Sequence, residues 1–211
     1  MPSSTTFGGI VLCGGRSTRM GAPKLWLSFG PETMLQRIVR ILREAVAPVV
    51  VVAASDQDLP PLPADVLVAC DDEPDLGPLA GLAVGLAVLR PHVEAAYASS
   101  CDVPLLRPAF VRRLTETLGT HELAIPHDGD YHHPLAAVYR TALADRVRTL
   151  VVERRLRPVF LLEGADGNVV PVDALRDVDP DLDSLRNTNR PEEYEAALAI
   201  AGLTSTGESH A

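Results

Sequence analysis

The sequence predicts an α/β fold, with helices packed on both sides of a mainly parallel sheet. Short apolar runs alternate along the chain with segments whose apolar residues recur at the spacing of a helix. Two of the runs, residues 49–52 and 66–69, lack the alternation of apolar and polar residues that a half-exposed strand shows, so we expect both of their faces to be covered. Strands and helices in this order build right-handed βαβ units, whose strands are parallel.

Each element of the first half has its own local signal. Residues 9–13 form an apolar run that enters Gly14 and Gly15, as a buried strand entering a turn does. Residues 32–45 carry apolar side chains at helical spacing with arginines on the other face, and Pro48 follows them. Further strands are expected at residues 49–52, 66–69 and 95–100, and further helices at residues 79–89 and 108–118.

Beyond residue 120 the pattern is less regular. We expect strands at residues 122–125 and 134–139 and a helix at residues 141–155. A last helix is expected at residues 191–201, because Pro191 suits a first helical turn and the two glutamates after it complement the positive end of the dipole. Residues 204–211 are small and polar, so we expect one domain over residues 1–203 and a disordered tail.

The composition excludes some classes of partner. The 211 residues carry 19 Lys and Arg against 28 Asp and Glu, a formal net charge of −9. Nucleic acid and anionic membranes are bound by clustered cations, so neither is an expected partner, whereas an anionic small molecule needs only a few local cations. No stretch reaches the roughly 18–20 apolar residues of a membrane-spanning helix, and residues 1–7 lack the pattern of a secretory signal. We therefore expect a cytoplasmic protein.

The cysteines carry no recognisable motif. Cys13, Cys70 and Cys101 are odd in number and far apart, and no two of them form a CxxC pair. Neither a disulfide framework nor a local zinc knuckle is indicated. We expect all three to be small buried hydrophobic residues.

The most informative segment is residues 12–24, with the sequence Leu-Cys-Gly-Gly-Arg-Ser-Thr-Arg-Met-Gly-Ala-Pro-Lys. Its glycines permit close approach to the backbone, and Arg16, Arg19 and Lys24 supply three cations. Successive backbone N–H groups in such a loop bind anions, so a polyphosphate is the expected ligand. The spacing matches neither a P-loop nor the GxGxxG dinucleotide turn. The alternative is a solvated basic surface loop.

This segment resembles the signature of nucleotidyltransferases with a Rossmann-like fold. The whole chain resembles, more narrowly, the molybdenum cofactor guanylyltransferase family. Four further segments carry the resemblance in the family's order: Gly77-Pro78-Leu79-Ala80-Gly81, Cys101-Asp102-Val103-Pro104, His133-Pro134-Leu135 and Asn187-Thr188-Asn189-Arg190-Pro191-Glu192. The resemblance implies a three-layer α/β fold and the transfer of GMP from GTP to the phosphate of molybdopterin, with release of pyrophosphate.

The resemblance also implies catalytic roles for three residues. Asp102 follows the expected strand 95–100, and ligands of α/β sheets collect at that end of the strands. We expect it to hold Mg²⁺, because a hard cation at a nucleotide site takes one or two carboxylates; the alternative is that Asp102 only stabilises the turn. Lys24 would neutralise the triphosphate of GTP, and Arg19 would clamp the second phosphate-bearing substrate.

The family pattern places the rest of the nucleotide site on three strand ends. Gly77 and Gly81 would let the guanine edge approach the backbone, and the alternative is an ordinary glycine-ended turn. Asp71 would bind the nucleoside, with Asp72 as a rival. After residues 49–52 the family often has an asparagine, where this chain offers Ser55. The expected nucleotide contacts are Leu12, Cys13, Gly14, Gly15, Lys24, Asp71, Gly77, Pro78, Leu79, Gly81 and Asp102.

The second substrate would meet the C-terminal motifs. Asn187 and Asn189 share one side of an extended segment and could pair with a pterin edge, although asparagine is also common in turns. His133 is expected in the same pocket. Recipients of the product would be molybdoenzymes or their chaperones. Two other functions stay open: a cytidylyltransferase or sugar-phosphate nucleotidyltransferase, and a catalytically silent protein that binds nucleotide or handles the cofactor.

Overall fold

The computed structural model describes residues 6–13, 23–71, 73 and 76–204. Within these ranges a seven-stranded sheet has the strand order β5-β4-β1-β6-β8-β7-β9, and β8 pairs antiparallel with both of its neighbours. All other neighbours in this sheet pair in parallel. The strands are β1 (Phe7–Leu12), β4 (Val49–Ala54), β5 (Leu67–Asp71), β6 (Ala95–Ser100), β7 (Leu123–His127), β8 (Ala136–Arg140) and β9 (Gly167–Pro171).

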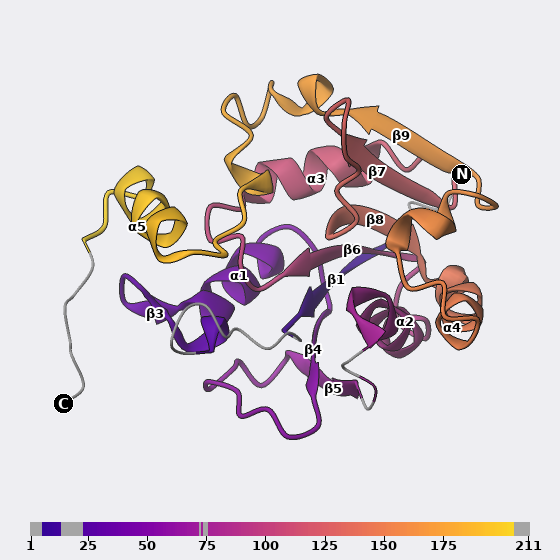
Figure 1. Ribbon diagram of the computed structural model, residues 1–211, viewed down its shortest axis with the longest axis horizontal. Coiled ribbons are helices and arrows are strands. Elements are labelled where there is room, and N and C mark those ends of the chain that lie inside the picture. Colours follow the sequence, from indigo (N-terminus) through magenta and orange to yellow (C-terminus); the bar gives the residue numbers. More distant parts are fainter. Residues whose placement is uncertain (1–5, 14–22, 72, 74–75, 205–211) are drawn as a thin grey trace.

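Helices cover both faces of this sheet (Figure 1). On one face α1 (Met34–Arg43) and α3 (Pro108–Glu116) pack against the side chains of Val11 and Val51. On the other face α2 (Pro78–Leu89) and α4 (Ala144–Val152) pack against Ile10 and Val50. Because alternate residues of each central strand enter different cores, β1 and β4 are apolar throughout. The α/β prediction with a mainly parallel sheet is confirmed.

The expectation that residues 66–69 are covered on both faces is wrong. The strand there, β5, lies at the edge of the sheet and pairs only with β4. Its burial alternates, because Leu67 and Ala69 pack under α2 while Val68 is 56% exposed. Cys70 lies on the same open face and is exposed, so the prediction that all three cysteines are buried is wrong for this one.

The first helix begins two residues later than predicted. The residues before the helix form a short hairpin of β2 (Ser28–Phe29) and β3 (Glu32–Thr33). Thr33 then caps α1, since its hydroxyl accepts from the Gln36 amide at 3.2 Å and the Gln36 side chain accepts from the Thr33 amide at 2.9 Å. This reciprocal cap explains why the helix starts at Met34.

The second half contains elements that the sequence pattern did not predict in full. β9 was not predicted. Its sequence, Gly-Asn-Val-Val-Pro, begins with glycine and ends with proline, so it gives little strand signal. The expected helix at residues 141–155 is a 3₁₀ turn, Thr141–Leu143, followed by the shorter α4. Further 3₁₀ turns lie at Lys24–Trp26, Pro158–Leu161, Val172–Leu175 and Asp183–Leu185.

The last helix, α5 (Pro191–Ile200), packs away from the main sheet (Figure 1). Its Ala197 and Leu198 form a small core with Phe29 and Met34, at the hairpin and the start of α1. This core holds the C-terminal segment beside the first strands of the chain. Residues 205–211, most of the predicted tail, lie outside the described ranges. No helix in those ranges is long and apolar enough to cross a membrane.

Candidate functional site

The sheet gathers the expected site residues at one edge. Parallel pairing places Leu12, at the end of β1, opposite Ser100 at the end of β6. The ladder between β4 and β5 ends with Ala54 opposite Asp71. The carboxyl ends of these four strands therefore meet at the same edge, which is where open α/β sheets bind ligands.

Lys24, Asp102 and Asn189 meet at this edge from three distant parts of the chain. The Lys24 ammonium donates to Asp102 Oδ2 at 2.9 Å and to Asn189 Oδ1 at 2.7 Å. The side chains of Lys24 and Asp102 are only 14% and 15% exposed. A partly buried ion pair with an added hydrogen bond holds the ammonium at a defined place, where it can bind an anion.

Asp102 is held from two sides. It lies in the turn after β6, and its Oδ1 accepts from the Ser100 hydroxyl at 2.5 Å. Its backbone carbonyl accepts from the Thr188 amide at 2.8 Å and from the Thr188 hydroxyl at 3.1 Å. Thr188 is buried, so the C-terminal segment is fastened to the turn that carries the carboxylate.

Asn189 is placed by the start of α5. The Asn189 and Arg190 amides both donate to the Glu193 carboxylate, at 2.6 and 3.1 Å. A carboxylate that binds the first amides of a helix fixes the path of the chain into it. The helix cap therefore sets where Asn189 meets Lys24.

A second group forms beside the first, at the ends of β1 and β5. A Cβ atom built on Gly81 would lie 3.2 Å from Leu12 Cδ2 and 3.6 Å from Asp71 Oδ2. The other oxygen of Asp71 accepts from the Glu73 amide at 3.0 Å. The structure thus brings together Asp71, Gly81 and Leu12, three of the predicted nucleotide contacts, and a side chain at position 81 would narrow the space between them.

Gly77 begins the helix that carries Gly81. Its φ of +75° favours glycine, and a Cβ there would meet none of the described atoms within 4 Å. Pro78 occupies the first turn of α2 and Leu79 is fully buried in the core below. Gly77 is thus needed for the backbone turn, while Pro78 and Leu79 set the position of the helix end.

Three of the predicted loop residues, Gly14, Gly15 and Arg19, lie outside the described residues, as does Asp72. Cys13 is described and is buried. Its carbonyl accepts from the Gln57 amide group at 3.2 Å. Gln57 therefore links the end of β1 to the loop after β4, where Ser55 is exposed.

A small cavity lies next to Asp102, and Asn187 lines it. Its volume is about 220 Å³, and its walls include Val103, His132, His133 and Ser184. Val103 directly follows Asp102 in the chain, so the cavity begins one residue from the Lys24 cluster. The structure thus gives the two asparagines different neighbours: Asn187 lines the cavity, whereas Asn189 contacts Lys24.

Histidines form the far wall of this cavity. His133 lies 3.2 Å from the Asp128 carboxylate through its Nε2. The pKa of Asp128 is lowered by hydrogen bonds from the amides of Tyr131 and Asp130 and then by His133, so the carboxylate is ionised and holds the ring. Burial, followed by repulsion from neighbouring histidines, lowers the pKa of His132. Near neutral pH, His132 is therefore a neutral donor or acceptor beside the cavity.

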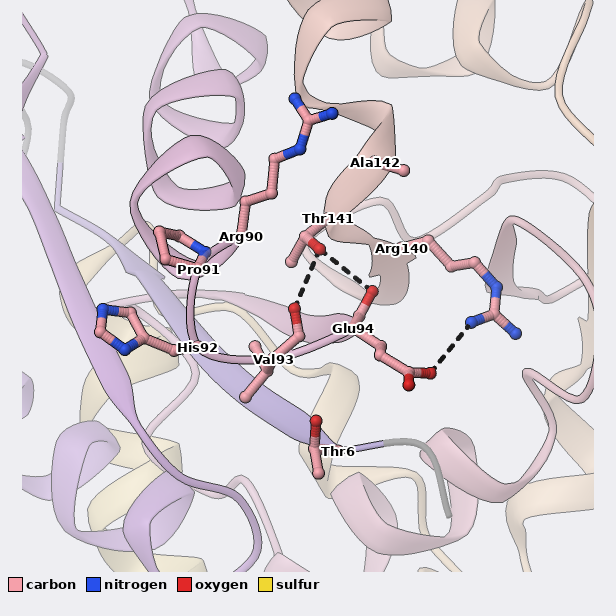
Figure 2. A pocket seen from close by; sticks show the side chains of 9 residues that line it. All are labelled: Thr6, Arg90, Pro91, His92, Val93, Glu94, Arg140, Thr141 and Ala142. Atoms are coloured by element: carbon pink, nitrogen blue, oxygen red, sulfur yellow. Dashed lines mark hydrogen bonds and ion pairs between the residues drawn. The ribbon is translucent and has the colours of Figure 1, made fainter. Parts of the chain in front are cut away.

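A larger cavity of about 490 Å³ lies at the opposite edge of the sheet (Figure 2). It is lined by Arg90 and by Arg140 at the end of the antiparallel β8. Arg90 pairs with Asp145 at 2.8 Å, and Arg140 lies 3.7 Å from Glu94. Arg90 and Arg140 already have carboxylate partners. The cavity also lies at the opposite edge of the sheet from Lys24 and Asp102, so we assign no part of the site to it.

Known proteins match both this chain and this arrangement. The family model described as MobA-like NTP transferase domain matches residues 9–166, from β1 to the segment before β9. The chain belongs to this family. It is 40% identical over 195 residues to a probable molybdenum cofactor guanylyltransferase of Mycobacterium tuberculosis H37Rv, covering 89% of this chain and 91% of that protein. A relative of the same name in Mycobacterium ulcerans is 37% identical over 77% of this chain and 82% of its own.

Solved structures agree on the fold. The molybdopterin-guanine dinucleotide biosynthesis protein A of Archaeoglobus fulgidus superimposes with a TM-score of 0.75 at 22% identity, over 92% of this chain and 98% of that one. The 2-C-methyl-D-erythritol 4-phosphate cytidylyltransferase of Thermus thermophilus gives 0.64 at 15% identity, over 92% and 98%. The predicted Rossmann-like nucleotidyltransferase fold is confirmed, and the protein is a nucleotidyltransferase of the MobA-like family.

Nucleotidyltransferases of this kind usually use a divalent metal, and the donors around Asp102 fit one. No group of three or more His, Cys, Asp or Glu that could hold a metal occurs among the described residues. Asp102 brings one carboxylate and a neighbouring hydroxyl, Ser100. That set is too small to retain a cation by itself but suits a hard cation that arrives with a triphosphate, whose oxygens and waters complete the shell.

Four residues at the site were not predicted from the sequence. Ser100, Thr188, Glu193 and Gln57 each hold a predicted residue in place, and none of them was assigned to the site from the sequence, although Thr188 lies within the Asn187–Glu192 motif. Glu193 had a local signal, since an acid at the third position of a helix that follows a turn often binds the helix amides. Ser100 contacts Asp102 only two residues away, whereas Thr188 and Gln57 make contacts across the fold that spacing along the chain does not show.

Proposed function

We propose that this protein transfers GMP from GTP to the terminal phosphate of molybdenum cofactor and releases pyrophosphate. The observation that carries the proposal is the convergence of Lys24, Asp102 and Asn189 at the carboxyl edge of the sheet. Close relatives named probable molybdenum cofactor guanylyltransferase over most of both chains support the choice of substrates.

The chemistry requires charge and alignment more than a strong base. The attacking group is a phosphate monoester, whose second pKa is near 6, so it is already an anion near neutral pH. The attack at the α-phosphorus of GTP builds negative charge on the leaving pyrophosphate. The Lys24 ammonium, held by Asp102 and Asn189, would neutralise this negative charge. Arg19, outside the described residues, is assigned to the phosphate of the second substrate.

We assign Mg²⁺ to Asp102. When bound with GTP, a divalent cation would neutralise phosphate oxygens and help to orient them. Ser100 keeps one carboxylate oxygen oriented, and Lys24 contacts the other. A solved structure of the same fold, from Mycobacterium tuberculosis H37Rv, is titled as a complex with manganese, with a TM-score of 0.56 and 19% identity. This supports a divalent metal at the fold and leaves the choice of Mg²⁺ to experiment.

We assign the nucleoside to the group formed by Asp71, Gly81 and Leu12, together with the adjoining Gly77–Leu79 segment, Cys13 and the two loop glycines. The backbone at Gly77 is open to a base edge, because a Cβ there would meet no described atom within 4 Å, whereas the buried Gly81 lets Leu12 and Asp71 pack close to the helix. A carboxylate can accept two N–H bonds from guanine, which neither cytosine nor uracil offers in the same arrangement. This favours GTP over CTP, the substrate of the cytidylyltransferase alternative.

The second substrate is assigned to the cavity lined by Asn187 and His133. Val103 lines it and directly follows Asp102, so a substrate bound there would lie close to the carboxylate and the Lys24 ammonium. The amide of Asn187 offers both a donor and an acceptor, which suits the polar edge of a pterin.

The cysteines are unpaired thiols, as is usual in the cytoplasm, where the recipients would be molybdoenzymes or their chaperones.

The test is direct. The purified protein is incubated with molybdenum cofactor, Mg²⁺ and each of GTP, CTP, ATP and UTP, and the products are separated and weighed by mass spectrometry. We expect the guanine dinucleotide and one pyrophosphate per product with GTP alone. Product with CTP instead would identify a cytidylyltransferase, and nucleotide binding without any product would identify a silent binding protein.

A further inference from the structure

Cys13 and Cys101 are neighbours across the centre of the sheet. The register of β1 with β6 ends with Leu12 opposite Ser100, and the Cys101 amide donates to the Leu12 carbonyl at 3.2 Å. This bond closes the ladder at the Leu12–Ser100 pair, so Cys13 and Cys101 are the next residue on each of the two neighbouring strands. Residues at equivalent positions on neighbouring parallel strands point to the same face of the sheet.

The two thiols lie in the same core. Both belong to the core under α1 and α3, whereas Leu12, one residue before, belongs to the other core. Cys13 is 3% exposed and Cys101 is 8% exposed. A hydrogen bond with Cys101, followed by burial, raises the pKa of the Cys13 thiol. Cys70, in contrast, is exposed on the edge strand β5.

We propose that Cys13 and Cys101 form a redox modification site, where a reversible disulfide switches the nucleotide site off. Neighbouring parallel strands lie about 4.8 Å apart, and a disulfide joins Cα atoms about 4.4–6.8 Å apart, so the backbone positions are within reach of one. The inference rests on the proposed nucleotide site, to which Cys13 is assigned, and adds a bond between two thiols of the protein itself.

The reaction balances with a peroxide as the oxidant. The Cys101 sulfur, the more exposed of the two, is oxidised to a sulfenic acid, and hydrogen peroxide is reduced to water. The Cys13 sulfur then attacks the Cys101 sulfur, the S–O bond breaks, and a second water leaves with the thiol proton. An external dithiol reverses the step by reducing the disulfide to two thiols. Burial of the Cys101 sulfur limits its access to peroxide and makes the oxidation slow.

The disulfide would join Cys13 and Cys101, the residues immediately before two parts of the nucleotide site. Cys13 is followed by Gly14 and Cys101 by Asp102. A disulfide brings its Cβ atoms to about 3.8 Å, roughly 1 Å closer than the strand spacing, so the strand ends must shift. Asp102 then moves relative to Lys24, whose contact is 2.9 Å in this structure. A misplacement of about 1 Å at a reacting centre costs on the order of 100-fold in rate.

The experiment compares the full-length protein with two variants, Cys101→Ala and Cys70→Ser. Each protein is treated with hydrogen peroxide, alkylated, digested without reductant and mapped by mass spectrometry. We expect a linked pair of peptides containing Cys13 and Cys101 in the wild type and in Cys70→Ser. In both, GTP turnover falls on the order of 100-fold and returns with dithiothreitol. Cys101→Ala keeps its turnover under peroxide.

Three results would overturn the inference. They are the absence of the linked peptides, a link that involves Cys70, and a loss of turnover that persists in Cys101→Ala. The peptide map is independent of catalysis. If the untreated protein makes no dinucleotide, the proposed function fails, while the map still decides whether the two thiols pair.

Discussion

Replacing Asn189 by alanine should weaken the use of GTP while leaving the second substrate almost unaffected. The side chain's amide oxygen accepts from the Lys24 ammonium at 2.7 Å, and the replacement removes that contact without touching Asp102. The ammonium would keep one of these two fixed partners, so its position relative to the triphosphate would be less defined.

The magnitude follows from the kind of bond and its exposure. A hydrogen bond to a charged group contributes about 1.5–3 kcal/mol. Asn189 is exposed, so water can replace much of the lost hydrogen bond, and we expect the loss to be about 1 kcal/mol of transition-state stabilisation. This corresponds to a decrease of about fivefold in kcat/KM for GTP.

The assay is steady-state pyrophosphate release, with GTP varied at saturating molybdenum cofactor and then the reverse. Asn187→Ala is the matched control, because the same truncation two residues earlier acts on the cavity beside Asp102. We expect it to raise KM for the cofactor and to leave KM for GTP unchanged. An equal effect of both variants on GTP, or no effect of Asn189→Ala, would refute the assignment of the two asparagines to different substrates.

Three other predictions test the site and the fold. Asp102→Asn keeps the size of the side chain but removes its charge, so Mg²⁺-dependent pyrophosphate release should fall on the order of 100-fold with an unchanged melting temperature; unaltered turnover would remove the metal assignment. Gly85→Ala would place its Cβ 2.6 Å from Ile10 Cγ2 in the core under α2. Overpacking costs about 1–3 kcal/mol, so the urea midpoint should decrease, and an unchanged midpoint would contradict the packing. Burial raises the pKa of both Tyr97 and Tyr139, and the charge of a nearby aspartate adds to the shift at Tyr97. Their raised folded-state pKa stabilises the fold below pH ~10 and that contribution is lost as the pH rises further, so these two phenols should ionise only as the protein unfolds in an ultraviolet titration.

The local order of elements was predictable because each signal involves neighbouring residues. The valine run of β4 and the small-residue strand β6 were predicted at nearly their observed bounds. Asp102 was expected at the end of β6 because a polar residue after a buried strand lies at the edge where ligands bind. The resemblance to known nucleotidyltransferases then supplied roles that spacing alone does not give.

The errors lie where an element depends on its place in the sheet. β5 has the same kind of sequence as β4, yet it is an edge strand with Val68 exposed. Whether a strand is central or at the edge depends on strand order, which apolar periodicity does not contain. The roles proposed for the site residues, including Arg19 and the two loop glycines, stay predictions until the variants are measured.

The sequence by itself determined the α/β class, most of the strands and helices, and which residue types follow the buried strands, because these depend on interactions between residues close in the chain. Only the tertiary structure decided that Lys24 meets Asn189, 165 residues away, and that Cys13 faces Cys101. Those contacts exist because strand order and the packing of α5 bring distant segments together, and that packing depends on the whole chain at once.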